Sequence, residues 1–336
     1  MSLKYSITQQ LEKAWYGKSV LTVLLIPLSW LFLGVITLRR ILYRTRIFRS
    51  KKLSVPVIIV GNLTVGGTGK TPLVIWIVNF LKQHGYKPGI ISRGYGGKAT
   101  SWPQQVRPDA DPAVVGDEAL VISQQTSCPM AVGPVRIDAG EALLKHADID
   151  VIVSDDGLQH YALQRDIEIA VIDGIRRYGN QRCLPAGPLR EPISRLEQVD
   201  MQVTNGPALR DEFGMHYQAD TAVNLASGES ATLSSFMDQD IVAIAGIGHP
   251  DKFFNFLRGH GLRLHTRAFP DHHAYQPGEL VFDNQPVILM TEKDAVKCRR
   301  FANSNWWYVP VTVELPDAFG KQLLSQLEKS RGQKTA

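Results

Sequence analysis

The segment 61–72, GNLTVGGTGKTP, constrains the fold of this chain more than any other feature. It follows the apolar run 57–60 (VIIV) and precedes 73–78 (LVIWIV), which has the composition of a buried helix. A strand, a glycine-rich turn, Gly-Lys-Thr and a helix in this order are typical of a P-loop. The sequence therefore predicts a phosphate-binding turn between a strand and a helix.

Each part of this turn has a role in binding a nucleotide. Glycines let successive backbone N–H groups point at phosphate oxygens, and the following helix adds the positive end of its dipole. Lys70 is expected to reach the β- and γ-phosphates, and the Thr71 hydroxyl to bind Mg²⁺. One position departs from the usual pattern, because Thr64 stands where a P-loop has its first glycine. A glycine-rich turn with an accidental Gly-Lys-Thr is the alternative, but the flanking strand and helix disfavour it. The expected nucleotide-binding residues are Thr64, Val65, Gly66, Gly67, Thr68, Gly69, Lys70 and Thr71.

Residues 19–38 form an uncharged, mostly apolar run, SVLTVLLIPLSWLFLGVITL. Its 20 residues are just enough to cross a bilayer core as a helix, and Pro27 would kink that helix, which membrane helices tolerate. A signal peptide is disfavoured, because Arg39 and Arg40 follow in place of a small-residue cleavage site. A buried helix of a soluble core is the alternative to a membrane anchor.

Basic residues are concentrated directly after this run. Seven lysines and arginines and no acidic residue lie between 39 and 52, whereas the whole chain has a formal net charge of only +5. The rest of the chain is therefore slightly acidic, which disfavours a general nucleic-acid surface. Basic residues beside a membrane segment bind anionic lipid and stay on the cytoplasmic side. Before the run, apolar residues recur every four positions from Leu3 to Trp15, which predicts a short amphipathic helix that could lie in the interface. A monotopic hairpin is therefore an alternative to a true span.

From residue 55 onward, short apolar runs alternate with helical patterns. This alternation predicts an α/β fold of the P-loop NTPase type, with a mostly parallel sheet flanked by helices on both faces. We divide the chain into an N-terminal anchor with its basic segment (1–52), a P-loop core (53–222) and a smaller C-terminal α/β domain (223–336) that closes over the site. Strands are expected at 57–60, 89–92, 130–132, 151–154, 168–172, 201–204, 241–247, 286–290 and 306–313, and helices at 71–83, 117–125, 137–146, from 253 and at 319–327.

Acidic side chains follow two of the expected elements. Asp155 and Asp156 come directly after the strand at 151–154, at the sheet edge where ligands bind in open α/β folds. Carboxylates there can hold Mg²⁺ directly or through water, and we favour this role over a simple polar turn. Asp117 and Glu118 open a helical run, where a helix cap and a first-turn acid explain them equally well.

Four further loops carry polar groups after strands. Arg93 lies in a glycine-rich loop and Arg190 in the proline-punctuated loop 184–192, and either arginine could bind an anion. In 269–275, a histidine beside an acid could serve as a general base or as its partner. Segment 290–295 (MTEKDA) could contact a nucleotide base or cap a helix, and we favour the first. A plain surface turn is the alternative for the Arg93 loop and the histidine loop, and a purely structural role is the alternative for 184–192.

Taken in order, these motifs resemble the tetraacyldisaccharide 4′-kinases, the lipid A 4′-kinases of Gram-negative bacteria. The similarity extends from the N-terminal anchor almost to the C-terminus, and the family's own phosphate loop is a variant that accounts for Thr64. The segments that carry it are 64–72 (TVGGTGKTP), 93–96 (RGYG), 116–118 (GDE), 155–160 (DDGLQH), 184–192 (LPAGPLREP) and 271–273 (DHH).

The resemblance implies a kinase that transfers the γ-phosphate of ATP to the 4′-hydroxyl of tetraacyldisaccharide 1-phosphate, giving lipid IVA. It also implies a place at the inner membrane, with the catalytic domains on the cytoplasmic side, an anionic membrane surface as partner, and no nucleic acid or protein partner. Asp117 matches the family's catalytic acid, which pairs with a histidine of the Asp-His-His loop, and we favour His272 over His273. We expect this pair to form only when the domains close over substrate. The implied catalytic residues are Asp117, His272 and Lys70, the Mg²⁺ ligands Thr71, Glu118, Asp155 and Asp156, and the substrate-binding residues Arg93, Gln159, His160 and Arg190.

Two functions of other classes remain open. One is a membrane-associated P-loop ATPase that acts as a switch without phosphorylating a lipid. Such a switch needs no base to activate an acceptor, so the Asp-His-His loop disfavours it. The other is a membrane-anchored nucleotide-binding adaptor without turnover, which we expect to lack the full set of acids at the strand ends.

Overall fold

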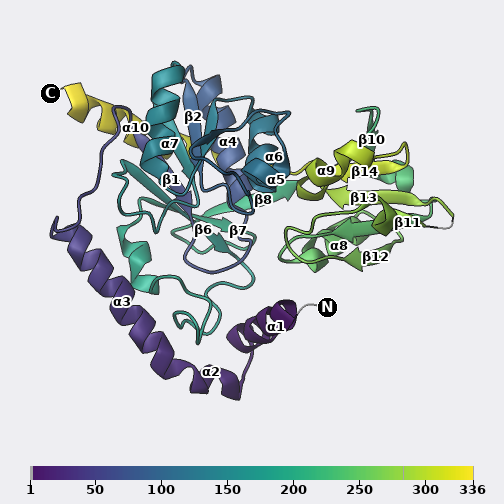
Figure 1. Cartoon of the computed structure of the whole chain (residues 1–336), viewed down its shortest axis with the longest axis horizontal. Coiled ribbons are helices and arrows are strands. Elements are labelled where there is room, and N and C mark those ends of the chain that lie inside the picture. Colours follow the sequence, from purple (N-terminus) through teal and green to yellow (C-terminus); the bar gives the residue numbers. More distant parts are fainter. Residues whose placement is uncertain (1–2, 283, 336) are drawn as a thin grey trace.

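The computed structural model describes residues 3–282 and 284–335 (Figure 1). Within this part of the chain, two β-sheets of nine and six strands form two units. We call the nine-stranded sheet with its helices the large unit, and the six-stranded sheet with α8 and α9 the small unit. The helices are α1 (Leu3–Tyr16), α2 (Val20–Leu24), α3 (Ile26–Arg44), α4 (Lys70–Gln83), α5 (Pro112–Val115), α6 (Asp117–Thr126), α7 (Arg136–His146), α8 (Pro250–Gly259), α9 (Glu292–Cys298) and α10 (Asp317–Thr335). The strands are β1 (Val57–Gly61), β2 (Pro88–Ser92), β3 (Gln104–Gln105), β4 (Met130–Val132), β5 (Val151–Asp155), β6 (Ile167–Asp173), β7 (Met201–Asn205), β8 (Phe213–Gln218), β9 (Thr221–Asn224), β10 (Ser230–Thr232), β11 (Ile241–Ala245), β12 (His265–Ala268), β13 (Val287–Thr291), β14 (Trp306–Val309) and β15 (Thr312–Glu314).

The large sheet has the order β15-β8-β7-β6-β1-β5-β2-β4-β3. Its strands are parallel except at the two edges, where β15 and β3 run antiparallel to their neighbours. β1 lies between β5 and β6, and Val60 is in register with Asp155. The turn after β1 and the carboxylates after β5 therefore emerge side by side from the same edge of the sheet.

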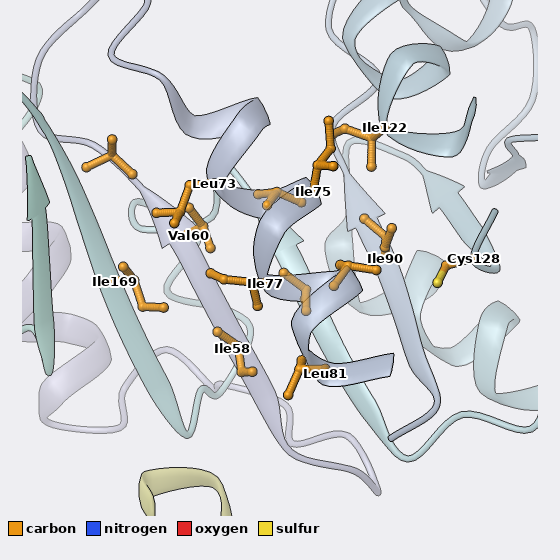
Figure 2. Close-up of a cluster of buried hydrophobic side chains, with 14 of the residues drawn as sticks. Ile58, Val60, Leu73, Ile75, Ile77, Leu81, Ile90, Ile122, Cys128 and Ile169 are labelled. Atoms are coloured by element: carbon orange, nitrogen blue, oxygen red, sulfur yellow. The ribbon is translucent and has the colours of Figure 1, made fainter. Parts of the chain in front are cut away.

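Helices cover both faces of this sheet, as predicted. On one face, α4 lays Leu73, Ile77 and Leu81, all fully buried, against Ile58 of β1 and Ile90 of β2 (Figure 2). On the other face, Ile137 and Leu143 of α7 belong to a second core cluster, together with Ile59 and Ile152. The central strands are packed between these two clusters, which hold their carboxyl ends in place at one edge of the sheet.

The small sheet has the order β10-β9-β14-β13-β11-β12, with β11, β12, β13 and β14 parallel. The strand expected at 306–313 is in fact two strands. β14 belongs to the small sheet and β15 to the large one, and Pro310 between them has no N–H to continue a ladder. α10 follows β15 onto the large unit, where Phe319 packs against Trp76 at a ring distance of 5.5 Å. Residues 312–335 thus lie on the large unit, although we had placed them with the small one.

The apolar run at 19–38 does not form one kinked helix. It divides at Leu25 into α2 and α3, and Pro27 lies in the first turn of α3, where its missing N–H costs no hydrogen bond. α3 is long and apolar enough to cross a membrane, and only 6% of its most apolar window is buried. Figure 1 shows it standing away from the sheets, in purple. Its exposed apolar side chains are Leu28, Trp30, Leu31, Val35, Leu38 and Ile41.

Candidate active site

The phosphate loop forms between β1 and α4 as the sequence predicts. Gly66 and Gly69 adopt φ angles of 105° and 99°, which residues with a Cβ rarely adopt. A Cβ on Gly69 would also lie 2.7 Å from the hydroxyl of Tyr217. Lys70 and Thr71 form the first turn of α4, so the loop N–H groups and the positive end of the helix dipole meet at one point.

Asn62, which sequence reasoning missed, organises this loop from inside. Its side-chain amide donates to the carbonyl of Thr64 at 2.8 Å, and its Oδ1 accepts from Nζ of Lys70 at 3.1 Å. The loop 184–192 braces the other side, because N–H of Val65 donates to the carbonyl of Pro188 and N–H of Arg190 to that of Leu63. The proline-punctuated loop is therefore a structural support of the phosphate loop.

Asp155 and Asp156 lie beside the phosphate loop but have opposite electrostatic surroundings. Burial, with the nearby charges of Glu118 and Asp156, raises the pKa of Asp155 to about 7. Its Oδ2 accepts from Ser92 at 3.2 Å, whereas its buried Oδ1 has no protein partner among the described residues. Burial also opposes ionisation of Asp156, but the charges of Lys70 and Arg190 lower the pKa of Asp156 to about 2.

The acids at this edge fit a divalent cation only in combination with a phosphate. No three His, Cys, Asp or Glu side chains of the described residues converge closely enough to hold a metal ion by themselves. Mg²⁺ commonly takes one or two carboxylates and completes its shell with phosphate oxygens and water. Asp155, with an unpartnered buried oxygen and other negative charges beside it, suits such a ligand. Glu118 is bound to Lys293 at 3.0 Å, and Asp156 to Arg190 at 3.0 Å.

The residues expected to bind substrate have different surroundings. Arg93 is exposed after β2, whereas Arg190 donates to Asp156. The amide of Gln159 donates to the carbonyl of Asn62 at 3.1 Å and to Glu191 at 3.2 Å, so it supports the loop. Burial lowers the pKa of His160 to about 4, and the positive charges around it add to this effect, so its ring is neutral at pH 7.

Asp117 and His272 are already in contact across the two units. Nδ1 of His272 lies 2.9 and 3.0 Å from the carboxylate oxygens of Asp117, which is 4% exposed. His273 instead contacts Glu279 at 2.9 Å, so the structure pairs Asp117 with the histidine that we favoured. Our expectation that the pair would form only on closure was wrong for this conformation, because side chains of α9 hold the two units together around it.

Two lysines of α9 lie beside this pair, and neither was identified from the sequence. Nζ of Lys297 lies 3.6 Å from Asp117, and Nζ of Lys293 lies 3.0 Å from both Glu118 and Asp271. Burial would raise the pKa of Asp117, but the hydrogen bond with His272 and the lysine charges lower it. The segment 290–295 thus caps a helix, since Thr291 accepts from N–H of Asp294 at 3.2 Å. Lys293 lies in the first turn of this helix and faces the site.

The end of α1 also reaches this edge of the large unit. Trp15 donates from its indole to the carbonyl of Pro185 at 2.9 Å, and the guanidinium of Arg176 lies 4.2 Å from the ring centroid of Tyr16. Arg176 also contacts His249 of the small unit, and a Cβ on Gly66 would lie 3.5 Å from Nε2 of this histidine. A cavity of about 380 Å³ opens there, lined by Trp15, Tyr16, Gly17, Ile175, Arg176, Gly179 and Asn180.

Comparison with known proteins identifies the family of this chain. The model of the LpxK family, tetraacyldisaccharide-1-P 4′-kinase, matches residues 21–328. The chain belongs to this family. It is 52% identical over 320 residues to the tetraacyldisaccharide 4′-kinase of Nitrosococcus oceani and 49% identical over 327 residues to that of Methylobacillus flagellatus, covering at least 95% of each chain. LpxK of Aquifex aeolicus, crystallised in complex with ATP, superimposes with a TM-score of 0.78 at 26% identity, covering 92% of this chain and 100% of that one.

The family and the fold expected from the sequence are thereby confirmed. The LpxK family is one of kinases, and its Aquifex aeolicus member carries ATP on the same fold. In the present chain, that fold places the phosphate loop, the acids after β5 and the Asp117–His272 pair around one edge of the large sheet.

Proposed function

We propose that this chain transfers the γ-phosphate of ATP to the 4′-hydroxyl of tetraacyldisaccharide 1-phosphate, giving lipid IVA. The observation that carries the proposal is the contact of 2.9 Å between Asp117 and His272 beside a phosphate loop. A sugar hydroxyl is a poor nucleophile at neutral pH, so a lipid kinase gains from a positioned base. An ATPase switch has no acceptor to activate, and the pair would be without purpose in it.

The phosphate loop would bind the ATP phosphates through the N–H groups of 64–71, and Lys70 would neutralise charge on the transferred group. Thr71, Asp155, Asp156 and Glu118 would hold Mg²⁺. An Mg²⁺ ion held there would neutralise negative charge that develops on the phosphates. Asp155 would then be ionised, although burial favours its protonated form in the free protein.

His272 would act as the general base. Its Nδ1–H donates to Asp117, which fixes the ring and leaves Nε2 to accept a proton. As the 4′-oxygen attacks the γ-phosphorus and the bond to ADP breaks, the hydroxyl proton moves to Nε2. Arg93 and Arg190 would bind anionic groups of the substrates, whereas Gln159 and His160 would shape the loop beneath them.

We further infer that α3 lies in the membrane interface and does not cross the bilayer. One side of the helix is attached to the large unit over much of its length, since Ser29 donates to the carbonyl of Cys183 at 2.7 Å and Arg40 to Gln198 at 2.9 Å. A helix that left the protein to span lipid would lose these contacts. Its opposite side is apolar and exposed, and basic residues follow it, which suits the anionic cytoplasmic face of the inner membrane.

A direct assay tests the kinase proposal. Purified full-length protein, γ-labelled ATP, Mg²⁺ and the tetraacyldisaccharide 1-phosphate in mixed micelles are expected to give a labelled lipid on thin-layer chromatography. The matched control is the same lipid already phosphorylated at the 4′ position, which is expected to give no labelled product. If ATP is hydrolysed equally with and without the lipid and no labelled lipid forms, the chain is an ATPase and the proposal is wrong.

The anchor proposal has its own test. Deleting residues 1–38 removes α1, α2 and most of the apolar helix α3 but keeps the basic segment, so attachment becomes electrostatic. We expect the truncated protein to leave anionic vesicles at about 1 M NaCl, where charges are screened within about 3 Å. The full-length protein is expected to remain bound under the same conditions. Truncated protein that still sediments with vesicles in high salt would mean that another apolar surface contacts the lipid.

A further inference from the structure

Lys293 contacts the nitrogen of His272 that faces away from Asp117. Its Nζ lies 3.4 Å from Nε2 of His272, and it is held there by Glu118 of the large unit and Asp271 of the small unit, each at 3.0 Å. Its side chain is 16% exposed. Burial would lower the pKa of Lys293, but the surrounding carboxylates raise it, so this side chain is a cation.

This position has a consequence for the protons of the ring. An ammonium group carries three donors and no acceptor, so it can approach an imidazole nitrogen only when that nitrogen presents its lone pair. Nδ1 must instead carry a proton, because the carboxylate of Asp117 beside it can only accept a hydrogen bond. The two neighbours therefore select the same tautomer, protonated at Nδ1 and free at Nε2.

Some of the other charged groups around the ring favour protonation of His272 and others oppose it. Oδ2 of Asp271 lies 3.8 Å from Nε2 and would favour its protonation, but Asp271 is itself paired with Lys293. Lys297 acts from behind Asp117, at 3.6 Å from its Oδ2, and the ring of Tyr95 lies 5.0 Å from the imidazole. Burial and the charge of Lys293 lower the pKa of His272, whereas the hydrogen bond and charge of Asp117 raise it, and the net change is upward.

We propose that Lys293 is a positioning residue that opposes protonation of Nε2 of His272, so that more of this ring is in the neutral form that can act as a base when the acceptor hydroxyl replaces Lys293 at Nε2. The inference rests on the proposed function, in which His272 receives the proton of the acceptor hydroxyl. Asp117 alone would orient the ring but would also favour a proton on both nitrogens. Lys293 opposes the second proton, because two positive charges this close repel each other.

The alternative is that Lys293 is only an ionic link between the two units. The chain offers a matched control for this role, since Arg300 of the small unit and Asp111 of the large unit form another such link at 2.9 Å. We therefore compare Lys293→Met, Lys293→Arg and Arg300→Met in the full-length protein. Lys293→Arg keeps the charge, and Arg300→Met removes a link away from the ring.

The first measurement is the pH dependence of kcat/KM. Lys293→Met is expected to move the acidic limb upward by about one pH unit, as losing one nearby like charge does. Lys293→Arg should stay within about half a unit of the parent protein on the same reasoning, and Arg300→Met should not move the limb. A rate that falls by the same factor at every pH in Lys293→Met, with an unmoved limb, would reduce Lys293 to an ionic link and overturn the proposal.

The second measurement does not depend on activity. In protein labelled with ¹⁵N-histidine, long-range ¹⁵N–¹H spectra at pH 7 report the ring form of His272, assigned with His272→Gln. We expect the neutral fraction of the ring in the parent to be the Nδ1–H tautomer, and the imidazolium fraction to be larger in Lys293→Met. An Nε2–H tautomer in the parent would overturn the inference. If His272→Gln remains fully active while the expected tautomer is seen, the proposed base is wrong and the positioning by Lys293 still holds.

Discussion

The phosphate loop forms between a strand and a helix that adjoin it in sequence, although loop 184–192 also supports it, whereas the Asp117–His272 pair joins side chains 155 positions apart. Asn62 reaches Thr64 and Lys70 within eight residues, and the strand and helix that bound the loop follow directly. The pair depends instead on how the small unit lies against α6. This site therefore combines a part that folds around one strand–helix turn with a part that exists only while the two units are in contact.

The largest expected effect lies in the local part. Lys70→Ala should reduce turnover by about 10³–10⁵-fold, the range for a positive charge on a transferring phosphoryl group, with little effect on folding. The measurement is kcat with labelled ATP, together with a thermal melt. Lys82→Ala is the control, because this lysine lies at the other end of the same helix and donates to the carbonyl of Thr126 at 2.8 Å. Lys70→Ala activity within about tenfold of the parent would contradict a P-loop kinase.

The next effect concerns the assembled part. Asp117→Ala and His272→Ala should each lower kcat by about 10²–10⁴-fold, with the KM for ATP little changed, because the phosphate loop does not depend on them. The double variant should be scarcely worse than either single one, since residues that act as a unit are not additive.

His273→Ala is the matched control for this cycle, because its ring contacts Glu279 and not Asp117. It should retain nearly full activity. Multiplicative losses in the double variant would mean that Asp117 and His272 work independently. The two residues would then not form a catalytic unit that depends on contact between the large and small units.

Local order explains what could be predicted from the sequence. The strand expected at 151–154 is observed as Val151–Asp155, and the helix at 117–125 as Asp117–Thr126, because apolar runs and first-turn acids act within a few residues. The phosphate loop followed from the same kind of signal. The pairing of Asp117 with the Asp-His-His loop came from the family resemblance, since no spacing links segments so far apart.

Long-range packing explains what could not be predicted. Lys293 looks like any first-turn lysine until β13 and α9 place it between Glu118 and Asp271. The return of β15 to the large sheet depends on its pairing with β8, which no local pattern in 306–313 reveals. Formation of the Asp117–His272 pair before any substrate is bound depends on those same contacts between α9 and α6.

The smallest expected effect probes the α6–α9 interface that holds the assembled part. Glu292, at the start of α9, accepts from the amide of Gln125 of α6 at 2.8 Å, and burial raises the pKa of Glu292 from 4.5 to about 7. In the unfolded chain this carboxyl loses its proton near pH 4.5, whereas the folded protein keeps it until about pH 7. Between these values the folded state binds more protons, so the free energy of unfolding falls as pH rises, and the loss is complete above pH 7.

Replacing Glu292 with a permanently neutral side chain should remove this loss. Glu292→Gln is expected to raise the free energy of unfolding by about 1–3 kcal/mol at pH 8, which a thermal melt would register as a few degrees, and to change little near pH 4.5. Glu314→Gln is the matched control, because its exposed carboxylate also accepts from a glutamine, Gln218 at 2.6 Å, and its effect should stay within about 0.5 kcal/mol. An equal gain at both pH values would mean that packing, not the buried charge, limits this interface. A loss at pH 8 would mean that Glu292 is ionised there and is stabilised by Gln125, so the interface would be held by a charge and not weakened by one.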